Sequence, residues 1–486
     1  MRLGDLADGG MTLPDGAAAI EITGIAADSR RVEPGYLFAA LPGSVADGAT
    51  FAQAAATRGA AAVLAADGAA VDVPAGVPVM RMHDPRAGLA ALAARFYPGQ
   101  PERLVAVTGT AGKTSVADFT RQICESAGLR SASIGTLGVV TAAGTEKGAL
   151  TTPDTVALHA LLDRLAREGT EAAAVEASSH GLDQRRLHGL RLTAAAFTNL
   201  GRDHLDYHRD EDAYFAAKLR LFNEVLPADG TAVVCMDDPH APGVVAAVRR
   251  RGQHLLAVGR GGEDIRLLDI VADGFSQRVT LEAFGRAVEV TIPLAGAFQV
   301  VNAVVAAGLA VASGVEAETA LTALGRLQGA PGRIEYVGRK ENGALAFIDY
   351  AHKPDAVRHV LAALRPMTQG RLVVVIGAGG DRDRGKRPLM GREAANAADV
   401  VIVTDDNPRS EDPTAIRAEV QAGAPGTLDI GDRALAIREG VAMLGPGDVL
   451  CVAGKGHETG QIVGDVTHPF SDRDEVLAAL AGAVAP

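Results

Sequence analysis

Short apolar runs recur along most of this chain, and each is followed by a polar or Gly-rich cluster and then by helix-like sequence. They occupy residues 104–107, 172–175, 194–197, 345–348, 372–376, 400–403 and 449–452. Uninterrupted apolar runs of this length are typical of strands that are buried on both faces. The repeated strand–loop–helix order predicts an α/β fold of mostly parallel sheets with helices on both faces.

Two breaks in this pattern predict domain boundaries. The first hundred residues alternate short apolar runs with Ala-rich, helix-like segments such as residues 51–61, and the sequence YPGQP at residues 97–101 then reads as a linker. A second break, PGR at residues 331–333, precedes the apolar run at 345–348. A chain of 486 residues is long enough for several domains. We therefore predict a small N-terminal α/β domain over 1–100, a central domain over 101–333 and a C-terminal, Rossmann-like domain over 334–486.

Composition narrows the class of protein. The net charge of −12 provides no basic field for nucleic acid or an anionic membrane. Cys124, Cys235 and Cys451 are far apart in apolar sequence, which fits neither a disulfide framework nor a zinc site. The start MRLGDLADGG lacks the apolar core of a signal peptide. The least polar long stretch, 296–315, contains Gln299 and Asn302 and predicts a core helix. We expect a soluble cytoplasmic protein with no nucleic-acid partner and no membrane insertion.

Unusual polar residues gather at the predicted strand ends. The clusters read TGTAGKTS, EASSHGLDQRR, TNLGRDHLDYH, DYAHKPD, GAGGDRDRGKRP, TDDNPR and AGKGHE. Turn formation explains their Gly and Asp residues. It does not explain why Lys113, His180, His204, His352 and His457 all fall at strand ends. Because ligands bind beyond the carboxyl ends of strands in open α/β sheets, we expect the clusters to converge on one or two crevices.

The first cluster predicts a phosphate-binding loop. TGTAGKTS at residues 108–115 connects a predicted strand to an amphipathic helix that ends near Gly128. In such loops the backbone N–H groups and the helix N-terminus face phosphate oxygens. Lys113 would reach the β and γ phosphates, and Thr114 could contact Mg²⁺. The match is imperfect, because Val107 occupies the usual first glycine position of this motif.

Three further residues are candidates for metal chemistry. Glu176 ends one predicted strand, and His204 follows another. Mg²⁺ prefers oxygen ligands, so Glu176 is the better candidate and His204 the more surprising one. Taken alone, each would more often be a satisfied polar group near a helix start. Lys218 would, by pattern alone, be an ordinary lysine on a helix surface.

Taken together, these clusters resemble the Mur ligase family in order and spacing over nearly the whole chain. The resemblance also includes EASSHGL, FTNLGRDHLDYH, the segment around Lys218, Gly332-Arg333 and GGDRDRGKRPLMG. It implies three domains: one for a uridine nucleotide, a central ATPase and a C-terminal lid. It further implies an ATP-dependent monomer that adds meso-diaminopimelate to UDP-N-acetylmuramoyl-L-alanyl-D-glutamate, a peptidoglycan precursor, through an acyl phosphate.

The resemblance also assigns residues. It implies that the UDP-precursor is bound by Ser29, Ser44, Val45, Ala46, Thr151, Thr152, Ser178, Gln184 and Arg186. It implies that ATP is bound by Gly109, Thr110, Ala111, Gly112, Lys113, Thr114, Ser115, Asn302, Arg333, Asp349 and His352. The implied ligands of two Mg²⁺ ions are Thr114, Glu176, His204 and Lys218. Lys218 would act as a carbamate formed with CO₂, which requires a neutral amine and hence a lowered pKa.

The segment Asp406-Asn407-Pro408-Arg409 is a candidate for selecting the amino-acid substrate. Arg409 offers a planar fork suited to a carboxylate, and meso-diaminopimelate differs from lysine by a second carboxylate. A buried arginine left unpaired by lysine would reject that substrate. The family resemblance completes this pocket with Arg382, Gly454 and Glu458, the last of which would meet the distal ammonium. Taken alone, Arg409 would be a solvated loop residue.

The sequence departs from the family pattern at three positions. Ala111 and Gln299 stand where Asn is usual, and Lys353 stands where Thr is usual. Three alternatives remain open: a lysine-adding member, a folylpolyglutamate synthetase and a P-loop nucleotide-binding protein without catalysis. The N-terminal hundred residues and DDNPR argue against the second alternative. The Lys218 segment and GKGHE argue against the third.

Overall fold

The computed structural model describes residues 1–7, 10–43, 46–204 and 207–482, and the chain separates into two compact units. The first unit comprises Met1–Arg266 and Val304–Ala320, and the second comprises Leu267–Ala303 and Leu321–Pro486. Among the described residues, no helix has both the length and the apolar character needed to cross a bilayer.

The N-terminal part of the first unit contains a four-stranded parallel sheet. Its strands lie in chain order: β1 (Gly24–Ala26), β2 (Tyr36–Ala40), β3 (Ala62–Ala66) and β4 (Val79–Met82). The helices here are α1 (Leu3–Leu6), α2 (Ala52–Thr57) and α3 (Pro85–Phe96). The helix-like segment at 51–61 is shorter than predicted, because the chain turns at Gly59 (φ +99°). Two apolar clusters cover the faces of this sheet, so it has its own core.

The central part of the first unit is built on a larger sheet. Parallel strands run in the order β12–β11–β10–β5–β9–β6, and antiparallel β7 and β8 extend the β6 edge. The strands are β5 (Arg103–Thr108), β6 (Ser131–Gly135), β7 (Gly138–Thr141), β8 (Gly144–Glu146), β9 (Ala172–Glu176), β10 (Ala194–Phe197), β11 (Thr231–Cys235) and β12 (His254–Gly259). The out-of-sequence order of the parallel strands requires crossover connections, which the intervening helices provide.

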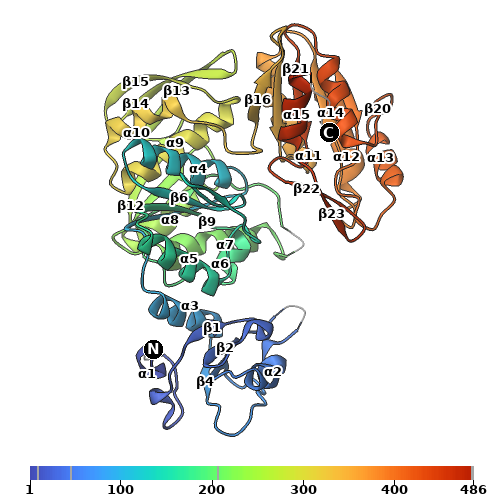
Figure 1. Cartoon of the computed structure of the whole chain (residues 1–486). Coiled ribbons are helices and arrows are strands. Elements are labelled where there is room, and N and C mark those ends of the chain that lie inside the picture. The colour runs from blue at the N-terminus through green and yellow to red at the C-terminus, as the bar shows by residue number, and fades with distance from the viewer. Residues whose placement is uncertain (8–9, 44–45, 205–206, 483–486) are drawn as a thin grey trace. The chain divides into compact units, whose positions relative to one another are not determined.

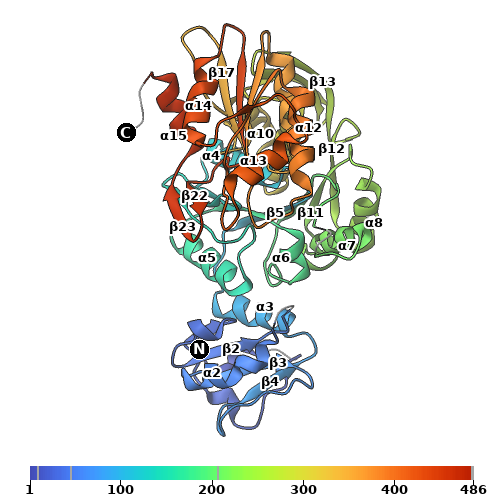
Figure 2. The ribbon, with the colours of Figure 1, turned by 90° about the vertical axis from the view of Figure 1, so that its right-hand side faces the viewer.

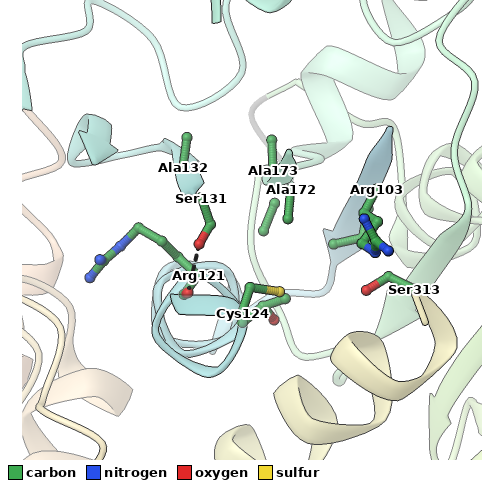
Figure 3. Close-up of a pocket in the computed structure, with 11 residues that line it drawn as sticks. Arg103, Arg121, Cys124, Ser131, Ala132, Ala172, Ala173 and Ser313 are labelled. Atoms are coloured by element: carbon green, nitrogen blue, oxygen red, sulfur yellow. Dashed lines mark hydrogen bonds between the residues drawn. The ribbon is translucent and has the colours of Figure 1, made fainter. Parts of the chain in front are cut away.

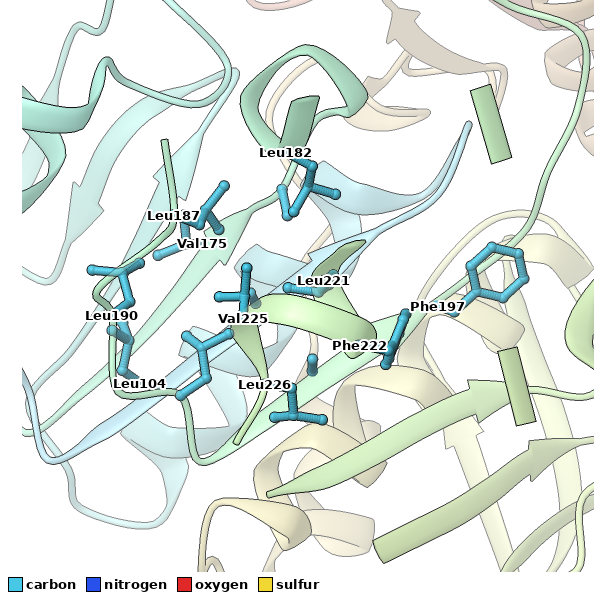
Figure 4. Packing of buried hydrophobic residues seen from close by; sticks show 14 of the residues in the cluster. Leu104, Val175, Leu182, Leu187, Leu190, Phe197, Leu221, Phe222, Val225 and Leu226 are labelled. Atoms are coloured by element: carbon cyan, nitrogen blue, oxygen red, sulfur yellow. The ribbon is translucent and has the colours of Figure 1, made fainter. Parts of the chain in front are cut away.

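Helices cover both faces of this sheet (Figure 1). They are α4 (Lys113–Ser126), α5 (Thr155–Arg167), α6 (Ser179–Asp183), α7 (Glu211–Arg220), α8 (Ala241–Arg251) and α9 (Ala297–Ala312). Helix α10 (Ala317–Ala323) follows, and the division into units falls within both α9 and α10. One face packs against α5, α8 and the π-helical turn Leu221–Val225, where Leu162, Phe222 and Val248 are buried. Figure 4 shows Leu221, Phe222 and Val225 of that turn in this cluster. Burial of one such side chain contributes about 1.5–3 kcal/mol, so this layer holds the loops at the strand ends in place.

The second unit begins in β13 (Ile265–Asp273), which is followed by β14 (Ser276–Ala283) and antiparallel β15 (Arg286–Ile292). Its main sheet runs β16–β17–β21–β18–β19–β20, with only β16 antiparallel. The strands are β16 (Glu335–Arg339), β17 (Leu345–Asp349), β18 (Leu372–Ile376), β19 (Val400–Val403), β20 (Leu428–Asp429) and β21 (Val449–Ala453). The hairpin β22 (Gly460–Val463) and β23 (Val466–Pro469) forms a separate small sheet.

Helices α14 (Arg433–Ala442) and α15 (Asp472–Leu480) lie on one side of this sheet, and α12 (Lys386–Ala397) and α13 (Pro413–Gln421) lie on the other (Figure 2). Helix α11 (Pro354–Leu364) packs beside α12. The α/β fold with mostly parallel sheets is thus confirmed, and every predicted strand is present. The three cysteines are buried and unpaired with one another.

Candidate active site

The backbone of the loop between β5 and α4 lies close to the loop that follows β10, which restricts the conformation of the first loop. A side chain at Gly109 would overlap Thr198 Oγ1, so only glycine fits there. Gly112 adopts φ +87° immediately before α4, and Thr114 and Ser115 are buried in the first turn of that helix. The loop therefore presents backbone N–H groups beside a helix N-terminus, which is the arrangement that binds phosphate.

A neighbouring loop, which follows β10, braces the phosphate loop. Ala111 N donates to Asn199 Oδ1 (2.9 Å), and Thr198 Oγ1 donates to Ala111 O (2.7 Å). Thr110 Oγ1 accepts from Gly201 N (2.9 Å) and lies 3.1 Å from Tyr214 Oη. These bonds join residues about ninety positions apart in the chain and hold the loop in one conformation.

Two lysines meet at this loop. Lys113 Nζ donates to Gly109 O (2.8 Å) and Thr110 O (3.1 Å), and Lys218 Nζ also donates to Gly109 O (2.8 Å). Lys218 is only 1% exposed and its ammonium lies 4.3 Å from the centre of the Tyr214 ring. Burial, together with the nearby charge of Lys113, lowers the pKa of Lys218 well below its ordinary value. Lys218 is thus a buried residue and not the surface lysine that helical pattern alone predicts.

Glu176 lies at the end of β9, where it is 2% exposed. Its Oε1 accepts from Thr136 N (2.8 Å) and its Oε2 from Thr136 Oγ1 (3.2 Å). A side chain at Gly135 would overlap this carboxylate, which explains the glycine there. Within the described part of the chain, Glu176 has no cationic partner.

The predicted sugar-peptide residues of the first unit gather beside Glu176. Thr152 Oγ1 donates to Glu176 O (2.6 Å) and lies 2.9 Å from Ser178 Oγ, which caps α6. Arg186 Nη1 donates to Thr152 O (2.6 Å) and its Nη2 to Gln184 Oε1 (2.8 Å). Thr151 Oγ1 joins the group through Thr136 Oγ1 at 3.2 Å. The structure therefore brings Thr151, Thr152, Ser178, Gln184 and Arg186 into one polar cluster.

His204 occupies a strained position in the loop after β10. Its φ is +52°, an uncommon value for a side chain other than glycine. Its N–H donates to Asp203 Oδ1 (2.8 Å), and its ring packs edge-on against His180 with centroids 4.9 Å apart. The His204 ring centroid lies 6.2 Å from that of Tyr214, which contacts the phosphate loop.

The uridine candidates lie at the carboxyl ends of two neighbouring strands. Ser29 begins a 3₁₀ turn after β1, and the loop after β2 contains exposed Ala46. Ser44 and Val45 lie outside the described residues. Because β1 and β2 are parallel, Ser29 and Ala46 follow the same edge of the sheet.

In the second unit, four predicted adenosine and phosphate residues gather near Tyr350. Gln299 joins two of them, since Asn302 Nδ2 donates to Gln299 Oε1 (2.9 Å) and Gln299 Nε2 donates to Arg333 O (3.1 Å). The Arg333 guanidinium lies 4.9 Å from the centre of the Tyr350 ring. This chain of contacts ties α9 to the segment that precedes β16.

Asp349 and His352 flank Tyr350. Asp349 Oδ2 accepts from Ile334 N (2.7 Å), and burial raises the pKa of Asp349 to about 6. His352 Nδ1 lies 2.8 Å from Tyr350 O, and burial lowers the pKa of His352 to about 4. At neutral pH this cluster therefore contains an ionised carboxylate and a neutral imidazole.

The predicted amino-acid pocket also lies within the second unit. Asn407 Nδ2 donates to Glu458 Oε2 (2.9 Å), so the loops after β19 and β21 meet. Arg409 has φ +52°, and its Nη1 donates to Gly380 O (2.7 Å). Pro408 and Gly454 lie on the same two loops as Asn407 and Glu458. Arg382 is exposed, and within the described residues no contact joins its side chain to this cluster.

A narrow pocket in the first unit lies away from these groups (Figure 3). It is lined by Arg103, Ser131 and Ala172, the first residues of β5, β6 and β9, and by Cys124 of α4. Ser131 Oγ donates to Arg121 O there (3.1 Å). Because the phosphate loop and Glu176 follow the carboxyl ends of β5 and β9, this pocket is at the opposite edge of the sheet.

Comparison with known proteins agrees with this arrangement. Family models match residues 21–97 ("Mur ligase family, catalytic domain"), 107–310 ("Mur ligase middle domain") and 332–456 ("Mur ligase, glutamate ligase domain"). A UDP-N-acetylmuramoyl-L-alanyl-D-glutamate–2,6-diaminopimelate ligase of Rhizobium meliloti (strain 1021) is 57% identical, with 96% of each chain covered. The chain belongs to the Mur ligase family.

Solved structures of Mur ligases share its fold. The structure of a UDP-N-acetylmuramoyl-L-alanyl-D-glutamate–2,6-diaminopimelate ligase superposes with a TM-score of 0.72, at 33% identity and 99% coverage of both chains. The Thermotoga maritima MurF ligase in complex with ADP gives a TM-score of 0.61 at 19% identity, covering 95% of this chain and 97% of that one. At that identity the second likeness concerns the fold alone.

The structure shows the contacts of the three residues that depart from the Mur ligase pattern. Ala111 lacks a polar side chain, but its N–H and C=O are both bonded to the loop after β10. Gln299 bridges Asn302 and Arg333, so the longer amide has partners at both ends. Lys353 is the N-cap residue of α11 and makes no side-chain capping bond there.

Sequence reasoning missed several residues of this Mur ligase site. Thr136 holds Glu176, Asn199 holds the phosphate loop, and Tyr350 lies among the adenosine candidates. The AGKGHE cluster also contains Lys455, which the sequence pattern does not single out and which donates to Asn407 Oδ1. Asn199, Tyr350 and Lys455 lie in the polar clusters at strand ends, so their position was a usable signal, whereas Thr136 lies outside those clusters.

Proposed function

We propose that this chain is an ATP-dependent ligase that joins meso-diaminopimelate to UDP-N-acetylmuramoyl-L-alanyl-D-glutamate, with release of ADP and phosphate. The observation that carries the proposal is the polar cluster of the second unit, in which Glu458 and Arg409 have opposite charges on two loops joined by the Asn407–Glu458 hydrogen bond. The distal end of diaminopimelate carries an ammonium and a carboxylate, which these two charges complement. The 57% identical relative with that printed activity supports the same reading.

The phosphate loop of the first unit supports ATP as the phosphoryl donor. Its backbone N–H groups and the start of α4 would hold the phosphate oxygens, as at other helix N-termini. Lys113 would exchange its carbonyl acceptors, Gly109 O and Thr110 O, for phosphate oxygens. In the second unit, Asn302, Arg333, Asp349 and His352 are proposed to hold the adenosine and phosphates.

The residues present fit Mg²⁺. Glu176 is a buried carboxylate whose hydrogen-bond donors, among the residues that the structure describes, are both groups of neutral Thr136, so its charge suits a cation. Within the described chain no three His, Cys, Asp or Glu side chains gather as a cage. Mg²⁺ is commonly held by few protein ligands together with substrate phosphates. Thr114, Glu176 and His204 are the proposed ligands or neighbours of the metal.

Lys218 is proposed to complete the site for a second Mg²⁺ as a carbamate. Carbamoylation requires the neutral amine, and the buried Lys218 with its lowered pKa supplies that form. The product would turn a cation beside Gly109 into an anion with oxygen ligands. When bound, Mg²⁺ would neutralise charge on the transferred phosphoryl group.

The proposed reaction activates a carboxylate that is otherwise inert toward amines. The D-glutamyl carboxylate attacks the γ-phosphorus, and the bond from that phosphorus to the ADP oxygen breaks. The amine of diaminopimelate then attacks the acyl phosphate, and phosphate leaves as the amide forms. The polar cluster around Thr152 and Arg186 would orient the dipeptide, and Lys113 would stabilise the charge on the phosphoryl oxygens.

The decisive assay follows phosphate release from ATP and Mg²⁺ in the presence of the UDP-muramoyl dipeptide. Diaminopimelate, lysine and glutamate are added in parallel, and the product is weighed by mass spectrometry. We expect release, and a product heavier by one diaminopimelate residue, with diaminopimelate alone. Equal efficiency with lysine would reject the proposed role of Arg409, and release with glutamate alone would reject the function.

We also propose that the chain works as a cytoplasmic monomer with domains over 1–100, 101–333 and 334–486. The three family models, at 21–97, 107–310 and 332–456, lie close to these bounds. Light scattering after size-exclusion chromatography tests the monomer against the chain mass of 49.8 kDa. Limited proteolysis tests the bounds, since cleavage is expected near residues 97–101 and 331–333.

A further inference from the structure

Lys455 lies at the centre of a polar cluster in the second unit. Its side chain is fully buried, and its Nζ donates to Asn407 Oδ1 (2.7 Å) and to Gly460 O (2.9 Å). Two carboxylates lie slightly farther away, with Asp406 Oδ1 at 3.7 Å and Glu458 Oε2 at 3.8 Å. Because Lys455 has no exposed surface, it acts on its neighbours and not directly on a ligand.

The first effect of Lys455 is to orient the amide of Asn407. Asn407 Oδ1 accepts from both Lys455 Nζ and Ile462 N (3.0 Å). An amide whose oxygen is held by two donors must turn its NH₂ group the other way. That group donates to Glu458 Oε2 (2.9 Å), so Lys455 fixes the position of Glu458 through Asn407.

The second effect of Lys455 is electrostatic. Burial and the neighbouring charge of Asp406 raise the pKa of Glu458, whereas Asn407 and Lys455 lower it. Without the Lys455 ammonium, the repulsion between the carboxylates of Asp406 and Glu458 would be less compensated by positive charge. Lys455 therefore favours the ionised form of Glu458, which is the form that receives an ammonium group.

Lys455 also reaches Arg409 through the hairpin β22–β23. The Lys455 bond to Gly460 O holds the start of β22. Farther along, Ile462 O accepts from Arg409 N (3.1 Å), and Gly464 N donates to Arg409 O (2.8 Å). The strained backbone of Arg409 is thus held by the same strand that Lys455 anchors.

We propose that Lys455 is a positioning residue for amino-acid selection, which holds Asn407, Glu458 and the Arg409 backbone in the arrangement that accepts diaminopimelate. This inference rests on the proposed function and extends it to a residue that would not touch the substrate. It assigns Lys455 a role in recognising the distal ammonium and carboxylate, and none in binding ATP or the UDP-precursor.

The test compares Lys455→Met with the wild-type full-length chain by steady-state kinetics. We expect the KM for diaminopimelate to rise about tenfold or more, because a charged hydrogen-bond centre is lost. The KM values for ATP and the UDP-muramoyl dipeptide are expected to stay within about twofold of wild type, since no group assigned to them loses a contact. Equal changes in all three KM values, or no change, would overturn the proposal.

Lys340→Met is the matched control. Lys340 Nζ donates to three backbone carbonyls of the same unit, those of Val441 (2.8 Å), Ala442 (2.9 Å) and Leu444 (3.2 Å). Its replacement is expected to lower Tm without changing the KM for diaminopimelate. A selective rise in that KM in Lys340→Met would mean that loss of stability alone mimics the effect, and would overturn the inference.

A double-mutant cycle with Glu458→Gln tests the coupling. If Lys455 acts through Glu458, adding Lys455→Met to Glu458→Gln should raise the KM by less than about threefold. Independent, multiplicative effects would contradict the proposal.

Should Lys455→Met fail to fold, Lys455→Gln, which keeps a donor but no charge, replaces it under the same criteria. A wild-type chain inactive with diaminopimelate would instead overturn the proposed function, whereas an active wild type with an unaffected variant overturns this inference alone.

Discussion

Lys113 and Lys218 donate to the same acceptor, the carbonyl oxygen of Gly109, each at 2.8 Å. Two ammonium groups this close disfavour each other's charge, and Lys218 is the more buried of the two. Burial and the neighbouring charge of Lys113 therefore favour the neutral amine of Lys218.

Replacing Lys218 is expected to abolish most activity without unfolding the chain. Lys218→Ala should lower kcat by about 100-fold or more, because the anionic ligand supplied by a carbamate is lost. Short aliphatic acids should restore part of the activity by occupying its place. Carbon-13 NMR in labelled bicarbonate should show a carbamate signal in the wild type that is absent from the variant. Exposed Lys147→Met is the control, and a Lys218→Ala variant as active as the parent would rule out the carbamate.

The phosphate loop should not tolerate a side chain at its first glycine. In Gly109→Ala the new methyl group would overlap Thr198 Oγ1, so the loop or its brace must shift. We expect a loss of about 1–3 kcal/mol in unfolding free energy and a raised KM for ATP. Gly325→Ala, where the nearest atom lies at an ordinary 3.5 Å, should change neither quantity. A Gly109→Ala variant with wild-type ATP kinetics would show that the close approach is unimportant.

The seven predicted strands are nearly completely buried, but burial alone was not a sufficient signal, since β6 and β11 are buried as well and were missed. Residues of β18 and β21 are buried at every position, so the sequence shows unbroken apolar runs. Strands β13 and β15 were missed because they have many exposed positions, and their polar residues hide the alternation. The hairpin β22–β23, mostly exposed, gave no apolar signal either.

The candidate site was predictable only in part, because many of its contacts join residues that are far apart in the chain. Residues at or just beyond the end of a predicted strand, such as Glu176 and Asn407, are located by the strand itself. Their partners come from distant parts of the chain: Lys218 reaches Gly109 across 109 residues, and Thr136 reaches Glu176 across 40. Such pairs are decided by packing of the whole sheet, and no local pattern around Lys218 or Thr136 contains that information.

Arg409 is expected to determine the choice between diaminopimelate and lysine. Arg409→Ala should raise the KM for diaminopimelate by about 30- to 100-fold, which corresponds to about 2–3 kcal/mol for a hydrogen bond between charged groups. The KM for ATP should change little. Discrimination against lysine should fall, because no unpaired guanidinium remains to penalise it. Exposed Arg260→Ala is the control, and equal losses for ATP and diaminopimelate would refute the assignment.

Asp349 should make stability depend on pH in a direction opposite to that of a salt-bridged carboxylate. Burial raises its pKa from 3.8 to about 6, so between these values the folded chain binds a proton that the unfolded chain does not. Its contribution is therefore fully present below about pH 4 and is lost as pH rises through 6, by at most about 3 kcal/mol.

Asp349→Asn keeps an acceptor for Ile334 N but does not titrate. Relative to wild type, the variant should gain about 2 kcal/mol in unfolding free energy between pH 4.5 and 7.5. Urea unfolding followed by circular dichroism measures this, since the chain contains no Trp. Exposed Asp355→Asn is the control, and parallel pH curves for wild type and Asp349→Asn would show that Asp349 is not the group responsible.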